Sequence, residues 1–438
     1  MSVRCVPNGI SSCTRSKVHF WRAHSVRPVS LVLVLGIVLS LFVAMPGQRS
    51  SVSASSASLR IISVELTAGQ PSYSVTVGSK RTSGRFANGI VPVSVGTELF
   101  FPMRPIIESM GGTVRFEKTQ NTVYFAVGPL MGAYDIGRRT LVDGTYATTV
   151  RKDLFRVTGK AGTLYLSETA LKTLVSQTGG TMKVAAKNGV TVITCQIPAT
   201  VKDARGADHS AFPAKAGKMR LVTLAPNLCE DIFAIGQGDH IIATTTYSDF
   251  PEAAKKIPTV GGYTTPSLEK LLVLSPDLIL VADGTPLDVV ARLRKMGRNV
   301  YVDDPKTMEA IVTSIRQISV VVGVPDRGFE LALSMHEAIT NVSSAAAKLP
   351  RKPSVYVEIW NSPLTSAGKG TFVSDIISVA GGTNIGDDTD APWPRLSEEF
   401  VIGHNPDVIV NASGMGDTDI TTRASFQELN AVKQGHVY

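Results

Sequence analysis

The sequence predicts an α/β protein with two parallel-sheet α/β lobes joined by a long helix, preceded by a β-rich α+β module and an N-terminal membrane helix. Three observations support this prediction. After residue 219, short apolar strands alternate with helical segments, which is typical of a parallel sheet covered by helices. Residues 327–348 can form one uninterrupted helix about 33 Å long. Residues 59–197 instead alternate apolar and polar side chains and are rich in Val, Thr and Gly, which is typical of strands.

The N-terminal segment has the pattern of an export signal. Residues 29–46 form an almost uncharged apolar run, and several basic residues precede it: Arg15, Lys17, Arg22 and Arg27. As a helix the run would be about 27 Å long, close to the hydrocarbon thickness of a bilayer. It has no polar face, which disfavours a buried core helix. We therefore expect residues 1–54 to be a cleaved signal sequence or a retained membrane anchor, and the remainder to lie outside the cytoplasm in a bacterial cell envelope.

Charge is divided unevenly along the chain. Residues 55–218 hold 20 basic and 10 acidic residues, a net of +10, whereas residues 219–438 hold 18 basic and 26 acidic residues, a net of −8. Nucleic acid is not an expected partner of an exported chain with this layout, and the positive half favours an anionic membrane or wall polymer. Cys195 and Cys229 are the only cysteines after the apolar run. A disulfide between them would suit an oxidising compartment, although they fall in different predicted domains.

The strand-rich module contains an internal repeat. A short helix predicted at 102–110 ends at Gly111-Gly112, and a second at 168–177 is followed by Gly179-Gly180. Each glycine pair leads into a strand, as expected where a helix stops in a left-handed turn. The pattern Val-Gly-Ser-Lys at 77–80 is also echoed by Ile-Gly-Arg-Arg at 136–139. The module is therefore predicted to consist of two weakly similar halves.

Residues 99–125 resemble the copper amine oxidase N-terminal-like domain of exported bacterial proteins. The region 59–197 contains no histidine, so a copper site built on imidazole is not expected. Two interpretations of the module remain. It could attach the chain to an anionic cell-wall polymer through its positive charge, or it could be a spacer with a basic surface.

Two segments of the acidic half match each other. Ser267 is followed by a helical segment with Glu269 in its first turn and by Pro-Asp at 276–277. Ser397 is followed in the same way by Glu399 and by Pro-Asp at 406–407. Each Ser is a plausible N-cap, and either Glu could serve simply to stabilise a helix dipole. As a matched pair, the two carboxylates suggest that equivalent places on two similar lobes have a second use.

Residues 219–438 resemble substrate-binding proteins of ABC importers, of the class whose two lobes are joined by a rigid helix, and within it the cobalamin-binding proteins. The resemblance rests on TLAPN at 223–227, YSDFP at 247–251, APWP at 391–394 and the two Glu…Pro-Asp segments. It implies that the chain delivers a macrocyclic or metal-chelate ligand, with cobalamin or another corrinoid favoured, to a permease dimer. No intrinsic cofactor is expected.

The resemblance also implies roles for individual residues. Glu269 and Glu399 correspond to the lobe-tip carboxylates that dock onto permease arginines, an arrangement favoured by bidentate Arg–carboxylate pairing. Ligand-contacting positions are carried over to a further set: Tyr247, Tyr263, Trp393, Trp360 and Pro226. Aromatic rings of this kind suit a flat macrocycle. The simpler alternatives are lobe core for the two Trp residues and a loop-anchoring ring for Tyr247.

Two departures from the class leave alternatives open. Ala-Asp-Gly at 282–284 stands where the class leads us to expect another Trp, which leaves haem or a ferric siderophore as alternative ligands. The chain ends at Tyr438, before a C-terminal helical segment expected from the class. Two alternatives follow: the sequence is a fragment, or its second lobe is incomplete. A second class of function is a non-transport envelope sensor or adhesion protein. An enzyme is not expected, because the sequence has no P-loop, no nucleophile elbow and only scattered histidines.

The predicted organisation follows from these patterns. The domains are a signal sequence or anchor at 1–54, the repeat module at 59–197, a linker at 198–218, the N-terminal lobe at 219–325, the inter-lobe helix at 326–349 and the C-terminal lobe at 350–438.

Overall fold

The structure is a computed structural model, and it describes residues 59–86, 90–137, 140–142, 148–149, 155–158, 163–211, 217–282, 284–414 and 417–438. The apolar run at 29–46 lies outside this part of the chain. Within the described ranges, no helix is both long enough and apolar enough to cross a membrane.

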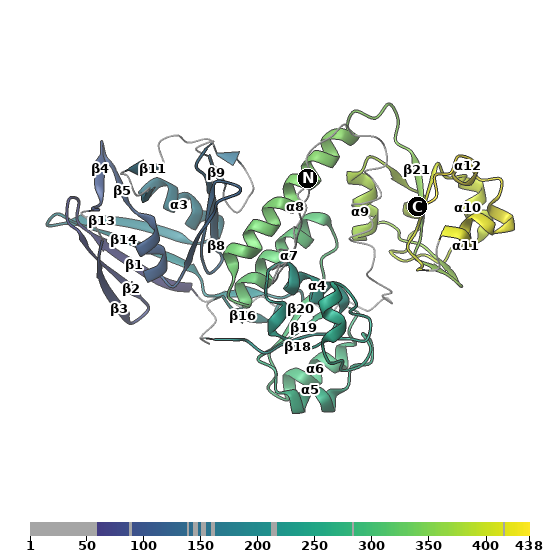
Figure 1. Cartoon of the computed structure of the whole chain (residues 1–438), viewed down its shortest axis with the longest axis horizontal. Coiled ribbons are helices and arrows are strands. Elements are labelled where there is room, and N and C mark those ends of the chain that lie inside the picture. The colour runs from purple at the N-terminus through teal and green to yellow at the C-terminus, as the bar shows by residue number, and fades with distance from the viewer. Residues whose placement is uncertain are drawn as a thin grey trace, which may run out of the picture. The chain divides into compact units, whose positions relative to one another are not determined.

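Figure 1 shows how the sheets and helices of the N-terminal module are arranged. In its described residues, the module has three sheets and two helices that share one core. Its elements are β1 (Leu59–Leu66), β2 (Ser72–Val77), β3 (Lys80–Arg85), β4 (Val93–Val95), β5 (Glu98–Pro102), α2 (Met103–Ser109), β6 (Thr113–Glu117), β7 (Thr122–Val127), β8 (Leu130–Asp135), β9 (Thr140–Val142), β10 (Thr148–Thr149), β11 (Phe155–Thr158), β12 (Thr163–Ser167), α3 (Glu168–Gln177), β13 (Thr181–Lys187) and β14 (Val190–Pro198). The strand orders are β13-β14-β1-β2-β3, β10-β9-β8-β7-β6 and β11-β12-β5-β4.

The two halves of the module share one order of elements. Strand, helix and hairpin follow each other as β5–α2–β6–β7 and again as β12–α3–β13–β14, and β5 pairs antiparallel with β12. Gly111 and Gly179 have φ of +83° and +73°. A Cβ on Gly112 would lie 2.2 Å from the carbonyl oxygen of Ala126, and one on Gly180 would lie 2.2 Å from that of Gln196. The double glycine of each half therefore supplies a left-handed turn and then room for a neighbouring strand.

The first lobe contains the predicted parallel sheet. Strands β17 (Leu221–Thr223), β18 (Ile241–Ala243), β19 (Leu278–Ala282) and β20 (Val300–Asp303) run parallel in the order β18-β17-β19-β20. Alternate residues of these strands point to opposite faces of the sheet and pack into two separate hydrophobic cores. One core is shared with α4 (Pro226–Ala234) and α7 (Met308–Val321), and the other with α5 (Leu268–Leu274) and α6 (Leu287–Lys295). Helices thus cover both faces, which explains why nearly every residue of these strands is buried.

The second lobe repeats this plan on a smaller scale. Strands β21 (Ser354–Glu358), β24 (Thr383–Asn384) and β25 (Val408–Asn411) run parallel in the order β24-β21-β25. Val437 adds a parallel bridge to Ile409, whose backbone N–H donates to the carbonyl of His436 at 2.9 Å. The lobe also contains the hairpin β22 (Trp360–Asn361) and β23 (Leu364–Thr365), the helices α9 (Phe372–Val379), α10 (Glu398–His404), α11 (Asp417–Thr422) and α12 (Asn430–Lys433), and the 3-10 helices η3 (Ile385–Asp388) and η4 (Ala424–Phe426).

A long helix, α8 (Pro325–Ala346), lies between the lobes in the sequence and packs against α7 (Figure 1). It also contacts the N-terminal module at β6, β7 and β8. Tyr124 and Met131 of the module share an apolar cluster with Phe329 of α8. At the edge of this cluster, Arg115 Nε donates to Asp326 Oδ2 at 3.2 Å, and the same guanidinium forms an ion pair with Glu330. The module is therefore attached to α8 by packing and by charge.

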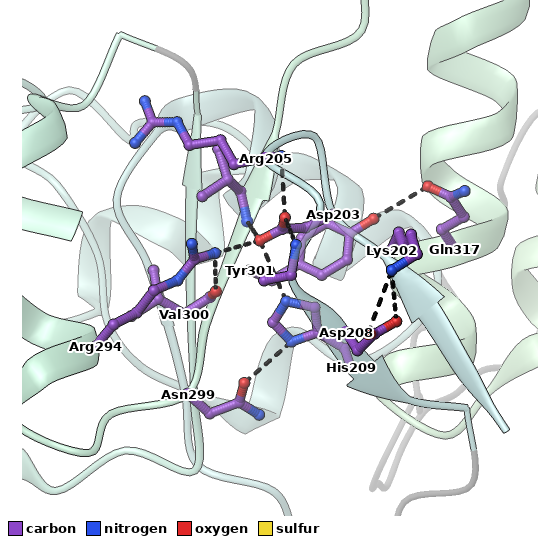
Figure 2. A network of polar contacts seen from close by, with 12 residues as sticks. Lys202, Asp203, Arg205, Asp208, His209, Arg294, Asn299, Val300, Tyr301 and Gln317 are labelled. Atoms are coloured by element: carbon purple, nitrogen blue, oxygen red, sulfur yellow. Dashed lines mark hydrogen bonds and ion pairs between the residues drawn. The ribbon is translucent and has the colours of Figure 1, made fainter. Parts of the chain in front are cut away.

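The segment 198–218, predicted as a linker, contains a structured hairpin. Its strands are β15 (Thr200–Lys202) and β16 (Asp208–Ser210), and its turn binds the first lobe (Figure 2). The buried carboxylate of Asp203 accepts from the backbone N–H of Val302 at 3.1 Å and forms an ion pair with Arg294. The backbone N–H of Ala204 donates to the carbonyl of Val302 at 2.9 Å. The sequence analysis gave this segment no strands, because contacts distant in sequence hold a hairpin that has no apolar periodicity of its own.

Cys195 and Cys229 do not pair. Cys195 lies in the core of the module and Cys229 in a core of the first lobe, and both thiols are free and buried. Burial raises the pKa of the Cys195 thiol to about 12, so this side chain acts as a small apolar core residue.

Candidate functional site

The matched Ser…Glu…Pro-Asp segments form matched structures in the two lobes. Ser267 caps α5 by accepting from the backbone N–H of Lys270 at 3.3 Å, and Ser397 caps α10 by accepting from that of Phe400 at 3.2 Å. Each helix then ends in a left-handed residue, with φ of 44° at Ser275 and 43° at Asn405. The two lobes therefore present short helices of the same length and the same capping.

The aspartate of each Pro-Asp pair has a structural role that the sequence analysis missed. Asp277 Oδ2 accepts from the backbone N–H of Arg220 at 2.8 Å, just before β17. Asp407 Oδ2 accepts from the backbone N–H of Ser354 at 2.9 Å, at the start of β21. The Arg351 guanidinium and these hydrogen bonds hold the pKa of Asp407 well below its usual range. Each aspartate thus joins the loop after a short helix to the first strand of its lobe.

The two glutamates point to solvent instead. Glu269 and Glu399 are both exposed in the first turn of their helices. Neither carboxylate forms an ion pair with another residue in the described part of the chain. Hydrogen bonds from its own backbone N–H and from Ser397 lower the pKa of Glu399, which keeps it ionised. The structure therefore leaves Glu269 and Glu399 exposed at equivalent positions of α5 and α10, and Glu398 adds a second exposed acid to the first turn of α10.

The loop after β18 presents two exposed aromatic rings. Tyr247 is 67% exposed and Phe250 is 61% exposed. The base of the loop is fixed by buried hydroxyl groups, since Thr244 Oγ1 donates to Ser248 Oγ at 2.8 Å and lies 2.9 Å from Thr223 Oγ1. Tyr247 is therefore not a loop-anchoring ring. Its ring stands in solvent at the carboxyl edge of the sheet, where open α/β sheets bind ligands.

Tyr263 lies at the same edge of the first lobe and is half-buried. A Cβ on Gly284 would lie 2.0 Å from Tyr263 Oη, so the glycine after β19 leaves room for this ring. The Ala-Asp-Gly sequence at 282–284 is thus explained in part by Tyr263, although Asp283 lies outside the described residues. Pro226 is the first residue of α4 and is half-buried, consistent with the preference for proline at this position.

The second lobe carries the two tryptophans. Trp360 is 44% exposed, and its Nε1 donates to the carbonyl of Ser362 at 2.9 Å across a short hairpin. Trp393 is half-buried. The backbone on both sides of it is fixed by hydrogen bonds: the carbonyl of Pro392 accepts from the backbone N–H of Gly368 at 2.8 Å, and that of Pro394 accepts from Ser366 at 3.0 Å. The exposure of Trp360 disfavours the core interpretation for that residue.

Several carboxyl groups near the carboxyl edge of the first lobe have raised pKa values. Burial and the neighbouring Asp249 raise the pKa of Glu230 to about 7. Burial raises the pKa of Asp303 to about 6, although the hydroxyl of Ser314 donates to it. Burial, with Asp303 and Glu230 nearby, raises the pKa of Asp231 as well. This region therefore carries less negative charge near neutral pH than its composition suggests. The described residues contain no cluster of three or more His, Cys, Asp or Glu suited to a metal ion.

Comparison with known proteins gives consistent matches for the second half of the chain. Residues 221–438 match the family model described as periplasmic binding protein. The vitamin B12-binding protein of Photorhabdus laumondii is 30% identical over 224 residues, which are 51% of this chain and 80% of that protein. The vitamin B12-binding protein of Vibrio cholerae is 31% identical over 229 residues, which are 52% of this chain and 81% of that protein.

Solved structures match over the same half. The periplasmic vitamin B12-binding protein of Vibrio cholerae is 29% identical with a TM-score of 0.46, covering 50% of this chain and 86% of that one. The periplasmic heme-binding protein of Roseiflexus sp. RS-1 in its apo form is 26% identical with a TM-score of 0.47, covering 50% of this chain and 88% of that one.

Proposed function

The chain belongs to the periplasmic binding protein family, and from this premise we propose that residues 219–438 bind a corrinoid outside the cytoplasm and deliver it to an ABC importer permease. Members of this family bind solutes and are not enzymes. The observation that carries the choice of ligand is the match to vitamin B12-binding proteins at 30% and 31% identity over about four-fifths of their length.

The exposed rings support binding of a flat, partly apolar ligand. Tyr247 and Phe250 on the first lobe and Trp360 on the second are unusually exposed for aromatic side chains. A macrocycle stacked on such rings gains apolar contact at little cost in side-chain entropy. Tyr263, Trp393 and Pro226 belong to the same proposed contact set, and their partial burial suits the walls of a site rather than its first point of contact.

The two exposed glutamates support docking to a two-fold permease. Glu269 and Glu399 occupy the second helical position after a capping serine in each lobe. The capping serines and the aspartates at 277 and 407 satisfy the local structure, so the glutamates remain available for a partner. Arginine forks on a permease dimer would pair with one carboxylate on each lobe and fix the orientation of the complex.

Calorimetric titration of the purified exported chain with cyanocobalamin, haemin and a ferric siderophore tests the choice of ligand. We expect cyanocobalamin to bind most tightly. Tyr247→Ala and Trp360→Ala should each weaken binding by about tenfold, because each removes a stacking ring worth roughly 1–1.5 kcal/mol. Phe116→Ala removes a ring that is 48% exposed in the N-terminal module and serves as the matched control. Tighter binding of haemin or of the siderophore would reject the corrinoid, and binding of none of the three would reject the proposed class of ligand.

Uptake measured with the cognate permease tests the docking role separately. The double variant Glu269→Ala with Glu399→Ala should lose uptake and keep its affinity for the ligand. A matched control removes two exposed glutamates elsewhere, Glu252 and Glu428, whose side chains are 81% and 87% exposed. Loss of ligand affinity in the first variant, or equal loss of uptake in both, would reject the docking role.

A further inference from the structure

One sheet of the N-terminal module has a solvent-facing side with a distinct chemistry. In the sheet β13-β14-β1-β2-β3, alternate residues of β1 such as Ile62 and Val64 are buried in the core. The residues between them point the opposite way. We call that outward side the basic face. Leu59, Ile61 and Val192 share it, and its charged, hydroxyl and amide residues are Lys183, Lys187, Thr194, Gln196, Ser63, Glu65, Ser74, Thr76, Arg81, Ser83 and Arg85.

The strand register arranges these side chains in rows across the sheet. Lys183 pairs with Thr194, Thr194 with Ser63, Ser63 with Thr76, and Thr76 with Arg81. One row therefore runs across all five strands with a cation at each end and hydroxyl groups between them. At about 4.8 Å between strands, the two cations stand roughly 19 Å apart.

The charged residues of these five strands are almost all basic. The five strands contain six basic residues, Arg60, Lys80, Arg81, Arg85, Lys183 and Lys187, and one acidic residue, Glu65. Arg81 forms an ion pair with Glu65. Lys183, Lys187 and Arg85 are exposed on the outward side. The basic face therefore carries uncompensated positive charge on both of its edges.

The first half of the repeat has a basic residue, Arg115, at the position equivalent to Lys183, and there the basic residue has a partner. Arg115 stands three residues after Gly112, as Lys183 stands three residues after Gly180. Arg115 binds two carboxylates of α8, on Asp326 and Glu330. In one half of the repeat this position therefore binds anionic groups within the chain, and in the other half it faces solvent.

The side chains that surround Lys183 on the basic face differ from those that surround Arg115, so the two surfaces suit different partners. We call these surrounding side chains the floor of each surface. Next to Arg115, Tyr124 and Ala126 form an apolar floor that packs against α8. The corresponding partners in the other half are Thr194 and Gln196. Around Lys183 the floor therefore consists mostly of hydroxyl and amide groups, with the exposed Ile61 beside Gln196. It suits a hydrated ligand whose oxygen atoms accept hydrogen bonds.

We propose that the basic face binds a linear polymer of the cell envelope that carries phosphodiester groups along its backbone. The lysine and arginine rims meet the negative charges, and the hydroxyl rows donate hydrogen bonds to oxygen atoms between them. The extracytoplasmic setting of the family makes such a polymer accessible to the module. This inference does not depend on the ligand of the two lobes.

Binding to immobilised poly(glycerol phosphate) tests the proposal. The triple variant Lys183→Glu, Lys187→Glu and Arg85→Glu should bind on the order of 100-fold more weakly than the wild type, by analogy with basic residues near anionic surfaces. The control variant Lys118→Glu, Lys348→Glu and Lys352→Glu makes the same change in net charge at exposed positions off the face and should bind like the wild type. Wild-type binding should also be lost between about 0.05 and 1 M salt.

Neutral dextran and vesicles of anionic phospholipid complete the experiment. We expect neither the wild type nor the variants to bind dextran. We expect the wild type to bind the vesicles more weakly than it binds poly(glycerol phosphate). Equal binding of the two triple variants to the polymer would overturn the proposal. Preference for vesicles over polymer would also overturn it, since the face would then contact a membrane. An unchanged melting temperature in both variants shows that the fold is intact, because all six substituted side chains are exposed.

Discussion

The substitution Asp203→Ala tests whether the hairpin β15–β16 is a structural part of the first lobe. The Asp203 side chain is fully buried and accepts from the backbone N–H groups of Arg205 at 3.0 Å, Ala207 at 2.9 Å and Val302 at 3.1 Å. It also contacts His209 and forms an ion pair with Arg294 (Figure 2). The variant would leave these groups without an acceptor.

The magnitude follows from these contacts. Removing one partner of a buried ion pair costs about 3–5 kcal/mol. The Arg294 side chain is 31% exposed and can regain water, so we expect a value near the lower end, about 3 kcal/mol. For a domain of this size, that corresponds to a fall in melting temperature of roughly 6–12 °C. Limited proteolysis should also show faster cleavage near the hairpin, because its turn would then lose the Asp203 contact to β20 and keep the backbone hydrogen bond from Ala204 to Val302.

Asp208→Ala is the matched control within the same hairpin. Its carboxylate pairs with Lys202 at 3.1 Å, and both side chains are about one-third exposed (35% and 36%). Such a pair contributes at most about 1 kcal/mol. If Asp203→Ala is no more destabilising than Asp208→Ala, the hairpin is only loosely attached and the inference of a structural role fails.

The acidity of Asp203 gives the same test a pH dependence. Burial opposes its ionisation, but the hydrogen bonds from His209, Ala207 and Val302 and the charge of Arg294 outweigh this effect and lower its pKa. A lowered pKa stabilises the folded state above the unfolded value of about 3.9 and loses this contribution as the pH falls through the folded value. The stability difference between the wild type and Asp203→Asn should therefore shrink as the pH falls below about 4.

Two further predictions follow from single contacts. Gly180→Ala should destabilise the module by about 1–3 kcal/mol in urea unfolding, because its Cβ would meet the Gln196 carbonyl at 2.2 Å. Gly403→Ala, with nothing within 4 Å, should be neutral or slightly stabilising, and equal effects would refute the steric explanation. Glu230 has a pKa raised to about 7, so the folded state gives up stability as the pH rises from about 4.5 to 7. Glu230→Gln should therefore raise the melting temperature at pH above about 7 but not at about pH 4, and a gain that is independent of pH would contradict this.

Periodic patterns in the sequence predicted the parts of the fold that local sequence determines. The apolar strands after residue 219 predicted the parallel sheets, which the structure and the family match confirm. The capping serines and the double glycines also identified helix ends correctly, since caps and left-handed turns depend on one or two residues.

Features that depend on distant contacts were not predicted. The hairpin at β15 and β16 has strands of three residues and is rich in charge, so nothing in its own pattern distinguishes it from a linker. Its stability comes from Arg294 and Val302, about 90 residues later in the chain. The pairing of Gly284 with Tyr263 was missed for the same reason. The proposed roles of Glu269, Glu399 and the aromatic residues remain predictions.

The attachment of the N-terminal module to α8 has a mechanical consequence. The module contacts α8 through β6, β7 and β8, and Arg115 binds Asp326 in the first turn of that helix. A tether that holds the module would therefore pass its load first into α8, and not into α5 or α10, the helices that carry Glu269 and Glu399.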